Sequence, residues 1–254
     1  MPEIIVKVKD LSKSYNGIKA VDAISFSVYK GEVFGILGPN GAGKTTTLEM
    51  IETLREIDHG SATIANIDVA TNPYKIRSLI GVQPQSPGFQ DRTKLTEIIQ
   101  MFAAAYGERV NPRTFLNEVG LGEKANAFVE QLSGGQKQRF SIVTALVHNP
   151  KVFFLDEPTT GLDPQARRNL WNLITEVKAR GISVILTTHY MEEAQILCDR
   201  VAIMDSGRII ALDTPNKLIE ALLKRGFSKP PIENKANLED VYIDLTGKKF
   251  KSEA

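Results

Sequence analysis

Apolar residues follow two different rhythms along this chain, and together they predict an α/β fold. A period of two, typical of a strand with one face in water, covers residues 3–10 (around Ile4, Val6 and Val8), 23–29 and 61–67. The first two of these stretches are predicted to pair as antiparallel strands. An uninterrupted apolar run, typical of a strand buried on both faces, occupies residues 152–155. The short apolar run at 33–37 is also interpreted as a buried strand, and another buried strand is predicted at 183–188.

Residues 93–148 differ from the rest because their pattern is helical. Apolar positions recur there at i, i+3, i+4 and i+7, as in Leu95, Ile98, Ile99 and Phe102, and strand-like alternation is absent. Two prolines and a glycine within residues 83–88 exclude a helix or a central strand and mark a boundary. We therefore expect a core made of residues 1–85 and 151–226, with a helical subdomain inserted at 86–150.

The last part of the chain, residues 227–254, is expected to follow this domain as a linker and a tail. Pro230 and Pro231 favour a linker over residues 227–235. A final short helix is predicted at 238–245, with one apolar side made of Leu238, Val241, Tyr242 and Leu245.

Bulk composition narrows the class of protein. The 254 residues are 42% hydrophobic and 24% charged, as in globular proteins, and the net charge of +1 indicates no nucleic-acid partner. The chain opens without a signal-peptide pattern, and no apolar run approaches the ~18 residues of a membrane span. Cys198 is expected to be a small core residue. We expect a cytosolic protein whose membrane role, if it has one, comes from a partner.

Residues 38–45 read GPNGAGKT and match the phosphate-loop pattern GxxxxGK[ST] between a predicted strand and a predicted helix. Glycines let backbone N–H groups turn inward, and the helix N-terminus adds unpaired amides and a positive dipole end. Lys44 can reach terminal phosphates, and the Thr45 hydroxyl can bind Mg²⁺. The alternative is a glycine-rich turn that happens to carry a lysine. The candidate binding residues are Gly38, Pro39, Asn40, Gly41, Ala42, Gly43, Lys44, Thr45 and Thr46.

Two carboxylates, Asp156 and Glu157, end the buried strand at 152–155. Adjacent buried carboxylates are costly unless a cation or a substrate requires them. In a phosphate-loop protein Asp156 is expected to hold Mg²⁺, and Glu157 is placed to act as general base on a water. The alternative is a solvated strand end. His189 closes the next buried strand, where ligands of α/β proteins bind, and this favours a phosphate contact.

A second anion-ready element lies at residues 132–139, which read LSGGQKQR. Ser133, Gly134 and Gly135 precede a predicted helix and offer a hydroxyl, two approachable backbones and a helix N-terminus. A two-fold dimer would let this element complete the phosphate site of the other subunit. A flexible Ser-Gly-Gly turn is the open alternative.

The motifs GPNGAGKT, the glutamine Gln85, LSGGQ, FFLDEP, the Gly161-Leu162-Asp163 turn and Thr188-His189 occur together in this order. In order and spacing, from about residue 11 to 212, they resemble the ATP-binding subunit of ABC transporters. The resemblance implies a P-loop NTPase (RecA-like) core with an antiparallel β subdomain and an inserted α-helical subdomain. It also implies hydrolysis of ATP with Mg²⁺ in a head-to-tail dimer.

The resemblance also implies roles for single residues. Tyr15, which by itself could be an ordinary strand-end aromatic, would stack on adenine. Gln85 would join Thr45 and Asp156 as a metal ligand and act as the sensor that links nucleotide to membrane partner. His189 would touch the γ-phosphate beside Glu157 and Lys44. The contacts to the opposing nucleotide, and the coupling of the two sites, would come from Ser133, Gly134, Gly135, Gln136 and Asp163.

The partners implied are a second ATP-binding subunit, identical or pseudo-symmetric, and an integral membrane transporter subunit. Through that membrane partner the chain would be held, as a peripheral cytoplasmic protein, on the inner face of the cell membrane. The tail, residues 238–247, is similar to the ending of exporter-type subunits. Two other classes fit less well. ATPases of this family that act on DNA or ribosomes carry a long coiled coil or tandem units, and this insertion is too short for the former. A GTPase would carry an NKxD motif, which this sequence lacks, and a small-molecule kinase would not need the LSGGQ segment.

Overall fold

The computed structural model describes residues 2–84, 88–228, 236 and 238–247, and it contains two β-sheets. The smaller sheet is antiparallel, in the order β2-β1-β4-β5. Its long hairpin of β1 (Ile4–Tyr15) and β2 (Ile18–Tyr29) is extended by β4 (His59–Ile64) and β5 (Ile67–Asp68). Antiparallel pairing of the first two strands is confirmed.

The larger sheet has six strands in the order β10-β9-β3-β8-β7-β6. Its strands are parallel except for β10, which pairs antiparallel with β9 at the edge. The sheet thus brings the carboxyl ends of β3, β7 and β8 to one edge, where ligands of such folds bind. Its strands are β3 (Val33–Leu37), β6 (Ile80–Gln83), β7 (Val152–Asp156), β8 (Ser183–Thr188), β9 (Arg200–Asp205) and β10 (Arg208–Asp213).

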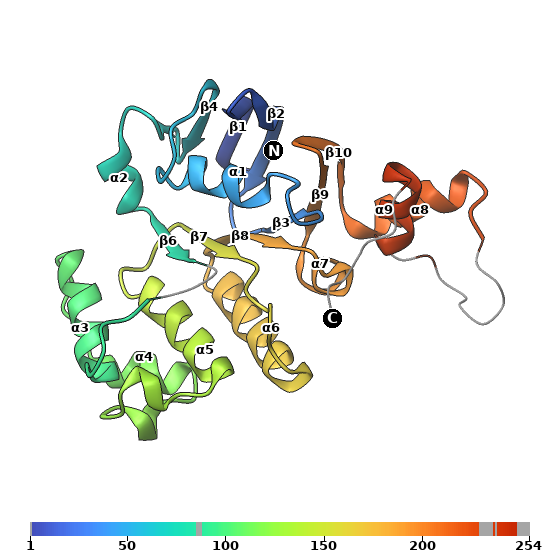
Figure 1. Ribbon diagram of the computed structural model, residues 1–254. Helices are drawn as coiled ribbons and strands as arrows, with labels where there is room; N and C mark the ends of the chain where they lie inside the picture. Colours follow the sequence, from blue (N-terminus) through green and yellow to red (C-terminus); the bar gives the residue numbers. More distant parts are fainter. Residues whose placement is uncertain (1, 85–87, 229–235, 237, 248–254) are drawn as a thin grey trace.

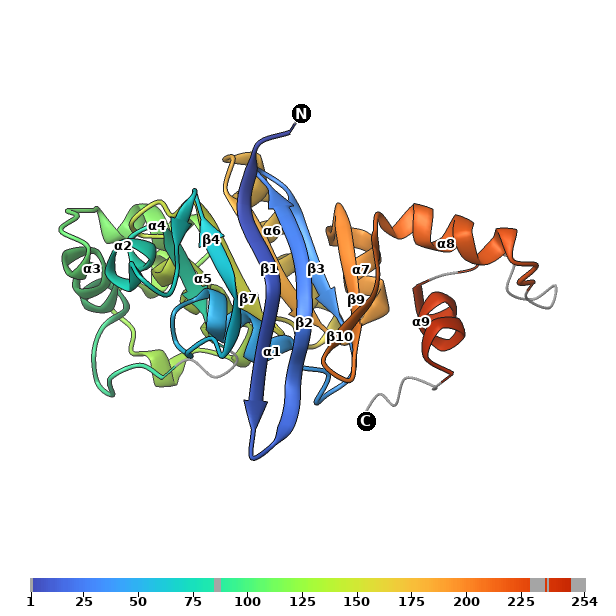
Figure 2. The same cartoon turned by 90° about the horizontal axis from the view of Figure 1, so that it is seen from above.

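Helices and the smaller sheet cover the two faces of the larger sheet, as Figures 1 and 2 show. On one face, Phe34 and Phe154 pack with α1 (Lys44–Ile51) and with the antiparallel strands. On the other face, Phe153 and Leu155 pack with α5 (Gly134–Ala145), α6 (Pro164–Ala179) and α7 (Met191–Leu197). Burial on both faces explains why these strands read as continuous apolar runs. Cys198 is buried in this second cluster, as expected.

The insertion between β6 and β7 is helical, as its periodicity predicted. It contains α3 (Leu95–Ala105), α4 (Pro112–Glu118) and α5, with two short 3₁₀ turns at Gly122–Lys124 and Val129–Gln131. The inward positions of α3, Leu95, Ile98 and Ile99, are fully buried. The remaining helix before the insertion, α2 (Pro73–Arg77), begins with a proline in its first turn.

Two helices follow the larger sheet, α8 (Pro215–Lys224) and α9 (Leu238–Thr246). Helix α9 buries Leu238, Val241 and Tyr242 in the same apolar cluster that covers α7. The predicted linker falls mostly at residues 229–235, which lie outside the described part of the chain. Within the described part, no helix has both the length and the apolar character needed to cross a membrane.

Three local predictions were wrong. Residues 61–67 form a hairpin instead of one strand, because Ala65 and Asn66 take left-handed backbone conformations (φ 49° and 63°) suited to a two-residue turn. Helix α1, which the sequence predicts to run to about Arg55, ends at Ile51. In β1 an irregularity between Ile4 and Val6 leaves Ile4 42% exposed while Ile5 is buried.

Candidate active site

The phosphate loop connects β3 to α1, and its glycines are required by close backbone approaches. A Cβ added at Gly38 would lie 2.2 Å from the Met204 carbonyl oxygen. At Gly43, where φ is 99°, it would lie 2.3 Å from the Ala20 carbonyl oxygen. Any larger residue at these two positions would push the loop away from β2 and β9.

Lys44 is buried although it carries a charge, with a side chain only 4% exposed. Its Nζ donates hydrogen bonds to the carbonyl oxygens of Gly38 (2.9 Å) and Pro39 (3.1 Å), and it lies 3.0 Å from Glu157 Oε1. These contacts offset the cost of burying an ammonium group. They also hold the Lys44 ammonium group next to the first residues of the phosphate loop.

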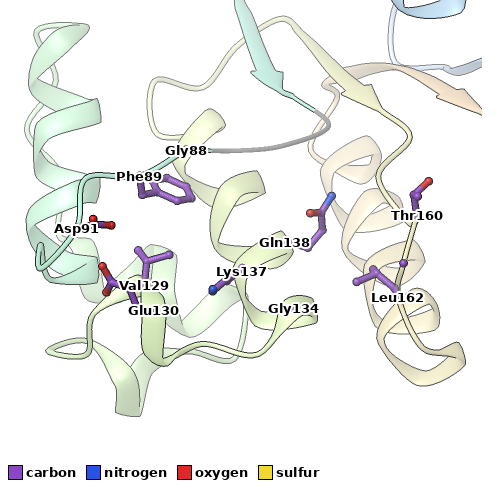
Figure 3. A pocket seen from close by; sticks show the side chains of 11 residues that line it. Gly88, Phe89, Asp91, Val129, Glu130, Gly134, Lys137, Gln138, Thr160 and Leu162 are labelled. Atoms are coloured by element: carbon purple, nitrogen blue, oxygen red, sulfur yellow. The ribbon is translucent and has the colours of Figure 1, made fainter.

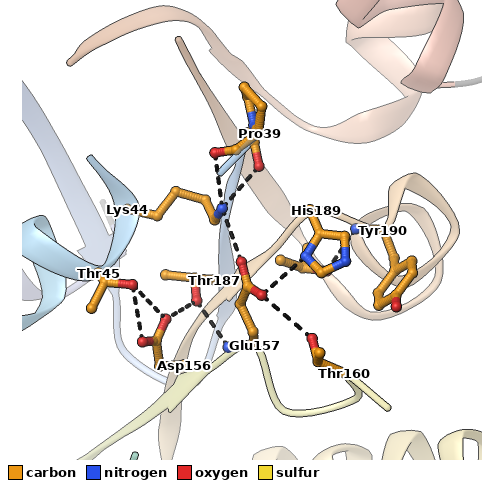
Figure 4. Close-up of polar contacts among 11 residues, drawn as sticks. Pro39, Lys44, Thr45, Asp156, Glu157, Thr160, Thr187, His189 and Tyr190 are labelled. Atoms are coloured by element: carbon orange, nitrogen blue, oxygen red, sulfur yellow. Dashed lines mark hydrogen bonds and ion pairs between the residues drawn. The ribbon is translucent and has the colours of Figure 1, made fainter. Parts of the chain in front are cut away.

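Glu157 lies between two basic side chains (Figure 4). Its Oε1 pairs with Lys44, and its Oε2 lies 3.0 Å from His189 Nδ1. The hydrogen bond with His189 and the charge of Lys44 lower the pKa of Glu157 to about 2, although burial acts in the opposite direction. The carboxylate is therefore ionised at neutral pH. Its backbone is left-handed, with φ 46°, a strained conformation typical of functional positions.

Asp156 faces the first turn of α1. Its two carboxylate oxygens accept hydrogen bonds from Thr45 Oγ1 at 3.2 and 3.0 Å. The Thr187 hydroxyl donates to Asp156 Oδ1 and accepts from the Glu157 backbone N–H at 3.0 Å, so Thr187 orients both acidic residues. Thr187 was not singled out from the sequence, although the strand pairing of Asp156 with Thr187 explains its position.

Thr45 and Asp156 together fit a magnesium ion. A hydroxyl and a carboxylate within about 3 Å of each other are the hard oxygen ligands that Mg²⁺ prefers, and a nucleotide and water complete its shell in such sites. Gln85, the third proposed ligand, lies outside the described residues. Among the residues described, none forms a cluster of three or more His, Cys, Asp or Glu side chains able to hold a metal by themselves.

Tyr15 ends β1 next to a tight turn and is 37% exposed. The Arg55 guanidinium lies 5.3 Å from the ring centroid, and the Lys13 ammonium lies 5.9 Å from it. The ring is thus held by two cations while part of it faces solvent.

The LSGGQ segment and the turn at Asp163 meet at a second place on the chain. They line a hollow of about 430 Å³ that includes Ser133, Gly134, Gly135, Gln136 and Asp163 and no residue of the phosphate loop. Asp163 caps α6 by accepting hydrogen bonds from the N–H groups of Gln165 and Ala166, each at 2.9 Å. Two of the predicted ligands also cap α5: the Ser133 hydroxyl accepts from Gln136 N–H, and Gln136 Oε1 accepts from Ser133 N–H.

Comparison with known proteins agrees with this geometry. The family model described as ABC transporter matches residues 21–160, more than half of the chain. The chain belongs to the ABC transporter family. As a member of it, this chain is an ATP-binding subunit that hydrolyses ATP, and the family, the P-loop NTPase fold and the ATPase activity predicted from the motifs are confirmed. Subunits of this family dimerise and work with membrane-spanning partners.

Individual relatives are similar over most of the chain. The Nod factor export ATP-binding protein I of Burkholderia pseudomallei is 42% identical over 85% of this chain and 73% of its own length. The protein of that name from Rhizobium etli is 39% identical, over 86% and 71%. A solved ATP-binding subunit of an ABC transporter has a TM-score of 0.82 and 31% identity, over 95% of this chain and 99% of its own. A dimeric ATP-binding cassette solved with ADP and Pi has a TM-score of 0.74 and 26% identity, over 83% and 98%.

Proposed function

We propose that this chain drives export through a separate membrane-spanning partner, by closing on ATP as a dimer and reopening after hydrolysis. The observation that carries the proposal is that two anion-ready elements occupy different surfaces of one chain. The phosphate loop holds Lys44 beside Glu157, whereas Ser133 and Asp163 line a hollow to which that loop contributes nothing. A head-to-tail pair brings each element against the other subunit's half-site.

In the proposed pair, the phosphates lie against the loop amides, Lys44 and Thr46 of one subunit. Ser133, Gly134, Gly135 and Gln136 of the other subunit approach the same phosphates through the N-terminus of α5. Asp163 couples the two sites from the adjoining turn. The second subunit is another copy of this chain or a closely related ATP-binding subunit.

Magnesium would be held by Thr45, Asp156 and Gln85, and it would neutralise part of the phosphate charge. Glu157 orients the attacking water and accepts its proton. In the described geometry the carboxylate is a weak base, since its pKa is about 2. When Lys44 pairs with phosphate oxygens, its positive charge is shared between them and Glu157. The Glu157 carboxylate is then stabilised less, so its pKa rises toward a value that suits a base. His189 holds the carboxylate from the other side and contacts the γ-phosphate.

Replacement of Tyr15 by alanine is expected to weaken ATP binding without changing the chemical step. Loss of a stacked base costs ~1–3 kcal/mol, which is roughly 5- to 150-fold in affinity. The dissociation constant of ATP and kcat, measured on the same preparation, check this. Tyr74→Ala is the matched control, because Tyr74 is 84% exposed on α2. Unchanged ATP affinity in Tyr15→Ala would leave Tyr15 as an ordinary surface aromatic.

The membrane partner is proposed to dock beside residues 85–91 and the helical insertion, which places the chain on the inner face of the membrane. A hollow of about 490 Å³ lies there (Figure 3). Phe89 packs at its wall against Phe140 of α5, and the acidic side chains of Asp91 and Glu130 lie at its rim. The hollow is lined both by residues 88–91, which follow β6, and by the LSGGQ helix α5, so a partner bound in it would contact both.

The proposed direction of transport is export. It is supported by the curated relatives, whose names describe them as export ATP-binding proteins. Cargo selection is assigned to the membrane partner, because the contacts proposed for this chain are with nucleotide, with a second ATP-binding subunit and with that partner.

Co-purification tests the proposed partnership. The chain, expressed with the membrane protein of its own transporter and extracted in detergent, is expected to bring that protein with it. Asp91→Lys reverses a charge at the rim of the docking hollow and is expected to lower the recovered partner several-fold. Glu220→Lys on α8 makes the same change on another surface and should have no effect. Equal recovery with both variants would contradict the proposed docking site.

A further inference from the structure

Glu193 is a carboxyl group buried in the protein core, with an exposed fraction of 0%. It belongs to the first turn of α7, four residues after His189. Its Oε1 accepts a hydrogen bond from Trp171 Nε1 at 3.1 Å. The hydroxyls of Thr159 and Thr188 act electrostatically on the carboxyl group, while Glu193 Oε2 and Thr159 Oγ1 are buried without a hydrogen-bond partner among the described residues. Burial raises the pKa of Glu193, while these polar neighbours act in the opposite direction.

The three partners of this carboxyl come from three segments, and each segment carries one residue of the proposed site. Thr188 immediately precedes His189, and its hydroxyl also accepts the Tyr190 backbone N–H at 2.9 Å. Thr159 is fully buried, two residues after Glu157. Trp171 lies on α6, the helix that Asp163 caps.

A second contact ties α6 to the segment after His189. The Arg167 guanidinium of α6 lies 4.7 Å from the centroid of the Tyr190 ring, and its charge also acts on the Glu193 carboxyl. Helix α6 and residues 190–193 are therefore joined both by this stack and by the hydrogen bond from Trp171 to Glu193. A shift of either segment would disturb both contacts.

We propose that Glu193 is a positioning residue that fixes His189, Glu157 and Asp163 relative to one another. The inference rests on the proposed function of that site. An apolar side chain of similar size would fill the same space without the cost of burying a polar group. What the carboxyl adds is a directional hydrogen bond to Trp171 of α6, together with polar interactions with the hydroxyls of Thr188 and Thr159. Glu193 itself touches neither Glu157 nor His189 through a described hydrogen bond, so it acts through the backbone of its partners.

Two substitutions separate hydrogen bonding from packing. Glu193→Met keeps the volume and removes the hydrogen bonds, and it is expected to lower kcat at least about tenfold with little change in ATP affinity. Glu193→Gln keeps an acceptor oxygen for Trp171 Nε1 and is expected to retain kcat within about threefold. Glu192→Gln is the matched control, because Glu192 is the exposed neighbour on the same helix. Trp171→Phe removes the indole donor with part of the ring volume, and it is expected to lower kcat less, again at unchanged ATP affinity.

A double variant with His189→Ala gives a readout that a purely structural role would not produce. If Glu193 acts through His189, Glu193→Met lowers kcat little further in a His189→Ala background. Native kcat in a folded Glu193→Met, or losses that multiply in the double variant, would overturn the proposal. Thermal unfolding shows whether Glu193→Met folds. If it does not, kcat is measured for Trp171→Phe alone and together with His189→Ala. A loss of kcat that multiplies in this double variant would then overturn the proposal. Glu157→Gln, measured in parallel, tests the proposed function separately, because native turnover there would reject the site itself.

Discussion

Glu157→Gln is expected to lower ATP turnover about 10²–10⁴-fold while ATP still binds. The amide has nearly the shape of the carboxylate and can still accept a hydrogen bond from Lys44 or His189, so the site should keep its geometry. It cannot accept the proton of the attacking water. ATP should therefore close the dimer without being consumed, and the closed pair should persist.

Two measurements check this expectation. The kcat for phosphate release gives the chemical loss, and light scattering with and without ATP gives the mass of the trapped species. Glu56→Gln serves as control, because Glu56 is exposed beyond the end of α1 and makes the same change in charge. Near-native turnover in Glu157→Gln would remove Glu157 from the role of general base.

Lys44→Ala is expected to weaken ATP binding at least about tenfold, or ~1.4 kcal/mol. The ammonium group is the one cation that the phosphate loop itself holds, through the carbonyl oxygens of Gly38 and Pro39. Its removal takes a charge from the phosphates and also leaves Glu157 with His189 as its remaining basic partner. Isothermal titration with ATP measures the affinity.

The control for this variant is Lys151→Ala, since Lys151 is exposed at the opposite end of β7 from Asp156. Both substitutions remove one positive charge, so general electrostatic effects cancel in the comparison. Equal ATP affinities for the two variants would show that the loop does not hold phosphate through Lys44.

Sequence patterns predicted the elements on which the site depends, because each of them is encoded locally. The apolar run at β3, the glycine spacing of the loop and the start of α1 follow one another in one short stretch of chain. Asp156 and Glu157 likewise end a strand that its own apolar run predicts. The pairing of Thr45 with Asp156 then follows from both lying at the carboxyl edge of one sheet.

Contacts between distant segments could not be predicted in the same way. Thr187 orients Asp156 because β7 and β8 are neighbours, and strand order is not written in any single stretch. Glu193 was not singled out from the sequence, because its burial against Trp171 results from the packing of α6 on α7. The turn at Ala65 and Asn66 was missed because it contains no glycine, the usual sign of a left-handed backbone.

Mixing two variants that are each defective in a different half of the site, at an ATP concentration where neither variant alone turns over ATP, tests the shared site most directly. Lys44→Ala keeps an intact Ser133 surface, and Ser133→Arg keeps an intact phosphate loop while placing a large charge on the exposed hollow. A mixed dimer contains one site with both halves intact, so an equimolar mixture is expected to recover about a quarter of native ATP turnover. A mixture no more active than the sum of its separate components would contradict the proposal that two copies of this chain share each nucleotide.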